Sequence, residues 1–264
     1  MKLRGDGKMS GSKRQLVAVL VFACLLVGGA KTVRAFGVES WWDDPKGKMQ
    51  VSTLPLDTMN GLDVVGINEK GAVPVKLQSG VGNYRGRRAV RILNDDGPVG
   101  TVSGGEVLAI INGSDFEDGT IETEIAGFPR RGAKPSTRGF IGVAFRVQDR
   151  GSRYEAFYLR MTNGRADDQL RRNHSAQYVS QPEFPWNRLR QESPGVYESY
   201  VDIDPEAWTK IKVVVSGSKA QLYVNGADRP CLIVNDLKLG ATRGQIALWT
   251  GSDTEAYFSN LTIR

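Results

Sequence analysis

The chain has 264 residues, of which 40% are hydrophobic and 24% are charged, so it is long enough to bury a sizeable core. Its formal net charge is +6, but residues 1–35 alone hold seven Lys/Arg and one Asp. The rest of the chain has 28 basic and 28 acidic residues, so the composition gives no argument for nucleic acid as a partner.

Residues 1–35 predict a signal peptide. Basic residues precede LVAVLVFACLLV (16–27), an apolar run that is too short to span a bilayer. Small residues at Val33 and Ala35 fit a signal-peptidase site, so cleavage is expected after Ala35. Cys24 opens a lipoprotein alternative, which Phe22 and the apolar residues after the cysteine fit poorly. We therefore expect an exported protein, periplasmic or secreted, with no membrane span in the mature chain.

The sequence predicts no cofactor. The mature chain would keep one cysteine, Cys231, and one histidine, His174, which together cannot form a disulfide or an ordinary zinc site. Loop aspartates occur at Asp95–Asp96 and at Asp115 and Asp118. They lack the ligand spacing of a calcium loop, although a structural calcium stays open.

Residues 36–60 form an irregular segment, and Trp41–Trp42 are expected to seal this segment onto the domain. From there, hydrophobic residues alternate with a period of two as far as the C-terminus. Turns such as Asn225-Gly226 separate the strands. Strands are expected at 62–67, 73–78, 87–93, 106–111, 119–126, 139–147, 153–160, 174–180, 197–203, 208–216, 219–225, 231–237, 243–249 and 255–263. No long segment has the helical period. The pattern predicts an all-β, antiparallel jelly-roll β-sandwich at 61–264.

Strands 139–147, 153–160 and 197–203 are expected to carry an apolar and a polar face, because successive side chains point to opposite sides of a strand. The second face would hold Phe140, Gly142, Ala144, Arg146, Tyr154, Ala156, Tyr158, Arg160, Glu198, Tyr200 and Asp202. Small, aromatic and charged residues are unusual in a core. They fit a concave sheet surface that meets a polar ligand.

The closing strands WTKIKVVVSGSKAQLYVNG (208–226) and GQIALWTGSDTEAYFSNLTI (244–263) resemble those of concanavalin A-like lectin/glucanase domains. The laminin-G-like and 3-keto-disaccharide hydrolase domains carry this pattern, and FEDGTIETEI (116–125) looks like one of their central strands. The resemblance covers roughly 62–264. It implies a curved-sheet jelly roll that binds or cleaves carbohydrate, or binds another protein.

The resemblance does not carry over the Glu-x-Asp-x-Glu strand motif of the glucanase-type hydrolases. The nearest match is Asp202-x-Asp204-x-Glu206. Its first acid is Asp, and Pro205 interrupts it, which disfavours a central strand. This segment is better interpreted as the turn before Trp208.

The stretch from Tyr158 to Tyr178 holds four arginines and the only histidine. Arg and Asn bind neighbouring sugar hydroxyls through paired hydrogen bonds, and aromatic rings cover the apolar face of a sugar. The expected ligand-binding residues are Arg146, Tyr158, Arg160, Asn163, Arg172, Asn173, His174, Tyr178, Trp186 and Tyr200. A carboxylate or sulfate on the ligand would explain the arginines more directly. Alternatively, the arginines pair with acids such as Asp167 and Asp168 and only lock the loop.

Glu198 is the candidate catalytic carboxylate. Asp202 shares its face but lies about 13 Å away along an extended strand, whereas glycosidase carboxyl groups are about 5–9.5 Å apart. A Gly-x-Ser-x-Gly elbow is absent. The sequence thus favours an exported carbohydrate-binding sandwich without catalysis. A glycoside hydrolase of the glucanase-like or 3-keto-disaccharide hydrolase type is the first alternative and a protein-interaction module the second. The oligomeric state is not predicted.

Overall fold

The computed structural model describes residues 52–68, 71–73, 77–94 and 105–264, all of which belong to one compact unit. The expected signal peptide, Trp41–Trp42 and Asp95–Asp96 lie outside the described residues.

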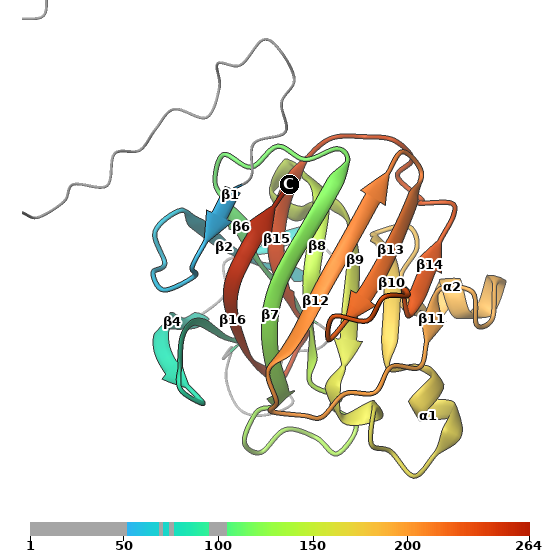
Figure 1. The fold of residues 1–264 in the computed structure, drawn as a ribbon, viewed down its shortest axis with the longest axis horizontal. Helices are drawn as coiled ribbons and strands as arrows, with labels where there is room; N and C mark the ends of the chain where they lie inside the picture. Colours follow the sequence, from blue (N-terminus) through green and yellow to red (C-terminus); the bar gives the residue numbers. More distant parts are fainter. Residues whose placement is uncertain (1–51, 69–70, 74–76, 95–104) are drawn as a thin grey trace, which may run out of the picture. The chain divides into compact units, whose positions relative to one another are not determined.

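The described strands form two antiparallel sheets, each of eight strands (Figure 1). Sheet A faces the viewer in Figure 1, with sheet B behind it. In spatial order, sheet A consists of β14 (Leu232–Val234), β13 (Lys219–Val224), β12 (Thr209–Ser216), β7 (Gly119–Pro129), β16 (Thr254–Ile263), β5 (Arg87–Asn94) and β4 (Leu77–Tyr84), with β1 (Ser52–Leu54) also paired to β16.

Sheet B consists of β11 (Glu198–Ser199), β10 (Ala176–Gln181), β9 (Arg153–Arg160), β8 (Phe140–Gln148), β15 (Gln245–Thr250), β6 (Glu106–Ile111), β2 (Leu62–Asn68) and β3 (Gly71–Val73). Two short helices, α1 (Gln169–Asn173) and α2 (Trp186–Glu192), lie beside its β10–β11 edge (Figure 1). Single 3-10 turns occur at Asp149–Gly151 (η1) and Met161–Asn163 (η2).

The core lies between the two sheets. In β12, Ile211, Val213 and Val215 are buried while the alternate positions are not, so period-two alternation places one face against sheet B. Burial of such aliphatic side chains stabilises the fold by about 1.5–3 kcal/mol each. Gly127 in β7 makes the two sheets fit, because a Cβ there would lie 2.8 Å from Cγ2 of Ile141 in β8.

Most predicted strands are confirmed, with ends that differ by a few residues. The strand expected at 197–203 is wrong beyond Glu198–Ser199, because the chain turns away and Asp202 and Asp204 form ion pairs with Arg165. Helices α1 and α2 are each two turns or shorter, so they leave no helical period in the sequence. Helix α1 begins after Asp168, whose carboxylate accepts a hydrogen bond from the backbone N–H of Arg171 at 2.8 Å.

Sheet B curls toward the side that faces away from sheet A. Gln181 in β10 donates to Glu106 in β6 at 3.0 Å, although four strand intervals separate them and would span about 19 Å in a flat sheet. The sheet must therefore be concave on this side. We call this side the concave face.

Candidate ligand-binding site

Two aromatic rings meet at the centre of the concave face. Tyr158 of β9 and Trp249 of β15 stack with centroids 4.5 Å apart, and both are almost fully buried. Gly142 of β8 lies between them in register, and a Cβ there would lie 2.0 Å from the Phe157 carbonyl oxygen. Because this position has no side chain, the two rings lean over β8 and form one apolar platform.

Glu106 lies next to this platform and has no cationic partner among the described residues. Its carboxyl accepts hydrogen bonds from the Tyr154 hydroxyl, from Trp249 Nε1 at 3.3 Å and from Gln181 Nε2 at 3.0 Å. Burial raises the pKa of Glu106 to about 7, although the hydrogen bonds from Trp249 and Gln181 oppose the rise. The concave face thus holds a carboxyl that exchanges a proton near neutral pH.

Arg160 ends β9 at the rim of this face and is 6% exposed. Its guanidinium donates to the Tyr158 hydroxyl at 3.1 Å, to Gln177 Oε1 at 3.0 Å and to the His174 carbonyl at 2.9 Å. It also lies 5.2 Å from the Tyr158 ring centroid. All three hydrogen-bond acceptors are uncharged, so no carboxylate among the described residues contacts this buried cation.

Glu198 joins His174 and Arg190 in a second polar group at the rim. Arg190 holds the Glu198 carboxylate with bonds of 3.0 and 2.7 Å, and His174 Nε2 lies 3.1 Å from Glu198 Oε1. Burial lowers the pKa of His174. The negative charge of Glu198 raises this pKa, whereas the positive charges of Arg190 and Arg160 lower it further.

Trp186 begins α2 at this rim and is 46% exposed. The guanidiniums of Arg190 and Arg160 lie 4.8 and 5.9 Å from its ring centroid. Cations at these distances stabilise the ring in place. Nearly half of the residue still faces solvent, so ring surface remains for a ligand.

The other expected residues surround α1. Tyr200 is 38% exposed, and the Arg172 guanidinium lies 5.1 Å from its ring and donates to its hydroxyl at 3.1 Å. Asn163 is buried and donates to the His174 carbonyl at 3.3 Å, while its Oδ1 has no hydrogen-bond partner. Asn173 is exposed and accepts from Gln169 at 2.7 Å.

Arg146 does not lie on the concave face, where the alternation of residues places it. Its side chain is fully buried between the sheets, where it pairs with Glu155 and Asp118 and donates to the carbonyls of Glu117, Gly217 and Gly240. A β-bulge shifts the register between Phe145 and Gln148, and Arg146 itself has a φ of 52°. The inserted residue reverses the alternation and turns the guanidinium inward.

Tyr178 also lies away from the concave face. Tyr178 is fully buried on the side of β10 that faces sheet A, paired in register with Phe157, and the two rings lie 5.5 Å apart. Its hydroxyl donates to Glu155 at 2.6 Å and accepts from the backbone N–H of Lys238 at 2.9 Å. It belongs to the same internal network as Arg146.

The sequence interpretation missed Glu106, Trp249, Gln177 and Arg190. Gln177 and Glu198 are register partners on one side of β10 and β11, and Gln177 also pairs with Tyr158. A strand order was needed to find these contacts. For Arg190 a local signal exists, because it lies eight residues before Glu198 in a helical segment that begins at Trp186.

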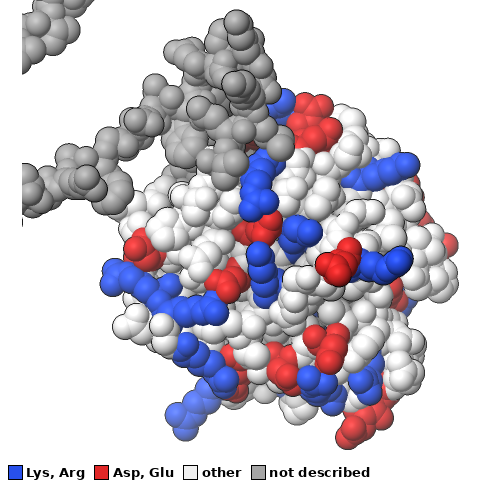
Figure 2. All heavy atoms as spheres, viewed as in Figure 1, with Lys and Arg blue, Asp and Glu red and all other residues white. Residues whose placement is uncertain are grey.

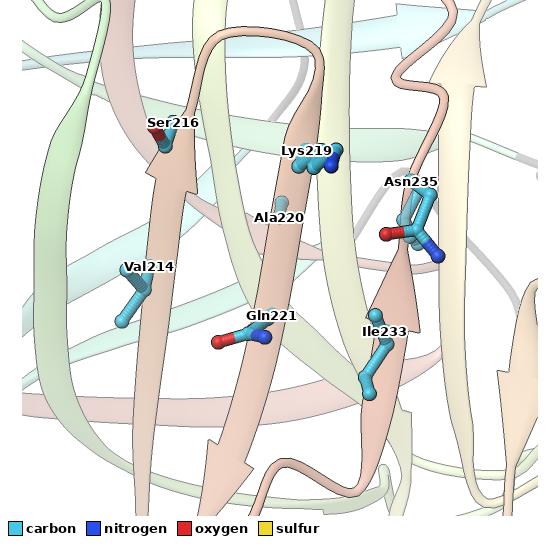
Figure 3. Close-up of a pocket in the computed structure, with 8 residues that line it drawn as sticks. Val214, Ser216, Lys219, Ala220, Gln221, Ile233 and Asn235 are labelled. Atoms are coloured by element: carbon cyan, nitrogen blue, oxygen red, sulfur yellow. The ribbon is translucent and has the colours of Figure 1, made fainter.

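On the outer side of sheet A, the described residues form no comparable site. Figure 2 shows cationic and anionic side chains interspersed on this side, and pairs such as Lys210–Glu122 and Arg91–Glu255 neutralise one another. A hollow of about 190 Å³ lies across β12, β13 and β14, where Val214, Gln221 and Ile233 project side by side (Figure 3). Small-molecule sites usually have volumes of about 300–1,000 Å³, so this hollow is not the candidate.

Metal ligation has no support in the part of the chain that the structure describes. No three His, Cys, Asp or Glu side chains gather there in a group that could hold an ion. Asp115 pairs with Arg243, and Asp118 contacts Arg146 and the backbone N–H of Gly217. Within the described residues, no helix is both long and apolar enough to cross a membrane.

The fold and the curved polar face define a concanavalin A-like β-sandwich. The chain belongs to the family of 3-keto-alpha-glucoside-1,2-lyase-like domains, whose model matches residues 77–264. No protein of curated function matches the chain at a significant level.

Two solved structures illustrate the distant likeness. A family 66 carbohydrate-binding module from Bacillus subtilis is 14% identical, with a TM-score of 0.47, and the match covers 78% of this chain and 98% of that one. A β-1,3-1,4-glucanase (lichenase) derived from a mouse hindgut metagenome is 13% identical, with a TM-score of 0.48, and the match covers 81% and 98% of the two chains.

Proposed function

We propose that the protein is an exported carbohydrate-binding β-sandwich that recognises a glycan at the rim of its concave face. The observation that carries this proposal is the exposed ring of Trp186, which two guanidiniums flank beside the buried platform of Tyr158 and Trp249. A flat ring covers the apolar face of a sugar at low entropic cost. Membership in a family named for a glucoside points to the same ligand class.

The polar groups around Trp186 suit sugar hydroxyls. Arg190 and Arg160 supply donors, Glu198 and the unpartnered Oδ1 of Asn163 supply acceptors, and Arg172 with Tyr200 extends the rim. Sugars present adjacent hydroxyl groups that donate and accept, so a mixed set of this kind is required. Export, which the basic and apolar N-terminal residues predict, would bring the domain to extracellular glycans.

The test is calorimetric titration with a panel of glucosides and oligosaccharides. Trp186→Ala is expected to weaken binding about fivefold, because stacking on one ring contributes on the order of 1 kcal/mol. Trp208→Ala is the matched control, since Trp208 lies on the outer side of sheet A against Tyr84. Equal weakening by both substitutions, or none by Trp186→Ala, would contradict the proposal.

A second candidate function is cleavage of a 3-ketoglucoside by elimination. A carbonyl at C3 acidifies the proton on C2. When a base takes this proton, a C1=C2 double bond forms and the C1–O bond breaks, with its electron pair leaving on the oxygen, which takes up a proton from water. His174 has the features of a base for this step, because the Glu198 carboxylate lies 3.1 Å from its Nε2 and its lowered pKa keeps the ring neutral at neutral pH. In this arrangement Glu198 is a positioning residue and not the nucleophile.

Exchange of the C2 proton in D2O, followed by NMR, tests this candidate directly. His174→Gln is expected to abolish both exchange and product release while glycan binding persists. The rate should fall as the pH drops through the lowered pKa of His174 and be flat above it, because only the neutral ring accepts a proton. Unchanged exchange in His174→Gln would leave binding as the function.

A further inference from the structure

Four arginines near the C-terminal end of β9 stand apart from the other described arginines. Of those that are at least partly buried, only Arg138, Arg160, Arg171 and Arg172 have no carboxylate within ion-pair distance. The others pair with Asp or Glu, as Arg91 does with Glu255 at 2.8 Å. We call these four residues the arginine cluster. Buried cations without partners are costly, so this exception calls for an explanation.

The cluster is drawn together by backbone contacts. The backbone N–H of Thr162 donates to the Arg138 carbonyl at 3.1 Å, and Met161 and Thr162 directly follow Arg160. The backbone N–H of His174 donates to the Arg171 carbonyl at 3.1 Å, while the His174 carbonyl accepts from Arg160 at 2.9 Å. These contacts bring the start of β8, the end of β9 and α1 together, and the charges of Arg160 and Arg171 are near enough to act on the guanidinium of Arg138.

Several donors there are left unused. The Nε atoms of Arg171 and Arg172 are buried without any acceptor. Arg138 bonds only to the carbonyls of Pro135 and Thr137. Burial lowers the pKa of Arg138, and the positive charges of Arg171 and Arg160 lower it further, so no nearby acid neutralises the group. Buried donors in native proteins normally have partners, which indicates that the missing acceptor comes from outside the chain.

We propose that the glycan is anionic and that its carboxylate or sulfate group binds to the arginine cluster. This inference rests on the proposed carbohydrate-binding function and specifies the class of sugar. Guanidinium groups bind such oxyanions through two parallel hydrogen bonds, and they stay charged at every accessible pH. The ring of Trp186 lies 5.9 Å from the Arg160 guanidinium, so a sugar stacked on it would place a charged substituent beside the cluster.

The test compares three sugars that differ only at C6: methyl α-glucoside, its uronic acid and its 6-sulfate. In calorimetric titrations of the full chain, one or both anionic sugars should bind at least tenfold more tightly than the neutral one. Higher ionic strength should weaken only the anionic sugars. The anionic sugar that gains affinity identifies the source of the charge.

Arg171→Gln should reduce the anionic preference to below threefold and leave the neutral sugar unchanged. Arg229→Gln removes the same charge from an exposed turn after β13 and should change nothing. If the neutral sugar binds as well as both anionic ones, this inference is overturned while the proposed function stands. If no sugar of either panel binds, the proposed function fails and this inference fails with it.

Discussion

Arg146 and Arg160 are buried in adjacent strands of sheet B, yet their surroundings are opposite. Arg146 is enclosed between the sheets with two carboxylates and three backbone carbonyls. Arg160 lies at the concave rim and contacts a phenol, an amide oxygen and one carbonyl, and no carboxylate from the part of the chain that the structure describes. The difference separates a cation that the fold neutralises from one that it leaves for a ligand.

The comparison predicts that the two arginines differ most in their effect on stability. Arg146→Met should lower the free energy of unfolding by about 3–5 kcal/mol, because it leaves the buried Glu155 carboxylate and several carbonyls without their donor. Urea unfolding measures this loss. The double variant Arg146→Met/Glu155→Gln should recover part of the stability, and an unchanged loss would show that the ion pair is not its cause.

Glu106 extends the comparison to the other sign of charge, because it too lacks a charged partner among the described residues. A carboxyl can take up a proton, whereas a guanidinium stays charged. The pKa of Glu106 is about 7 in the folded chain against an ordinary 4.5. The folded state therefore binds this proton more tightly. This proton contributes about 3 kcal/mol to the free energy of unfolding. The contribution is fully present below pH 4.5 and is lost as the pH rises through about 7.

Glu106→Gln isolates this contribution. The melting temperature of the variant should match that of the native chain near pH 4.5 and exceed it by several degrees at pH 8, because Gln has no charge to bury. Subtracting the two curves cancels the other titrating groups, including Asp236, whose pKa shifts in the opposite direction. A difference that is constant with pH would contradict the raised pKa.

Replacing Arg160 should affect stability less than replacing Arg146 does, and it should affect ligand binding more. Arg160→Met should lower the free energy of unfolding by about 1–2 kcal/mol, since it leaves only neutral acceptors without a donor. Binding of anionic sugars should fall more than tenfold. A stability loss as large as that of Arg146→Met, without any change in binding, would remove the distinction between the two regions.

The alternation of residues predicts the correct face of sheet B for Arg160 and the wrong face for Arg146. It correctly places Tyr158 and Arg160 on one face, where the guanidinium lies against the ring. It fails at Arg146, because the bulge depends on one inserted residue with positive φ that the sequence pattern does not reveal. The polar residues of the same strands thus divide between the concave face and the interior.

Strand order accounts for the other misses. Trp249 is far from Tyr158 in the sequence but is its second neighbour across sheet B, and Glu106 lies one strand further. Period-two patterns assign faces within a strand and carry no information on which strands become neighbours. The side on which Tyr178 lies also depends on strand pairing, because its register partner is Phe157, which faces sheet A.

Tyr200 offers the smallest and most specific test, because it holds a member of the arginine cluster through its ring and its hydroxyl. Tyr200→Phe keeps the ring under Arg172 and removes the hydroxyl, so anionic-sugar binding should stay within about twofold. Tyr200→Ala also removes the ring, whose cation–π contact is worth about 0.5–1 kcal/mol, and should weaken binding about two- to fivefold. Both variants should keep the native melting temperature within about 2 °C, since Tyr200 is partly exposed. Equal losses in the two variants would show that the hydroxyl, and not the ring, positions Arg172.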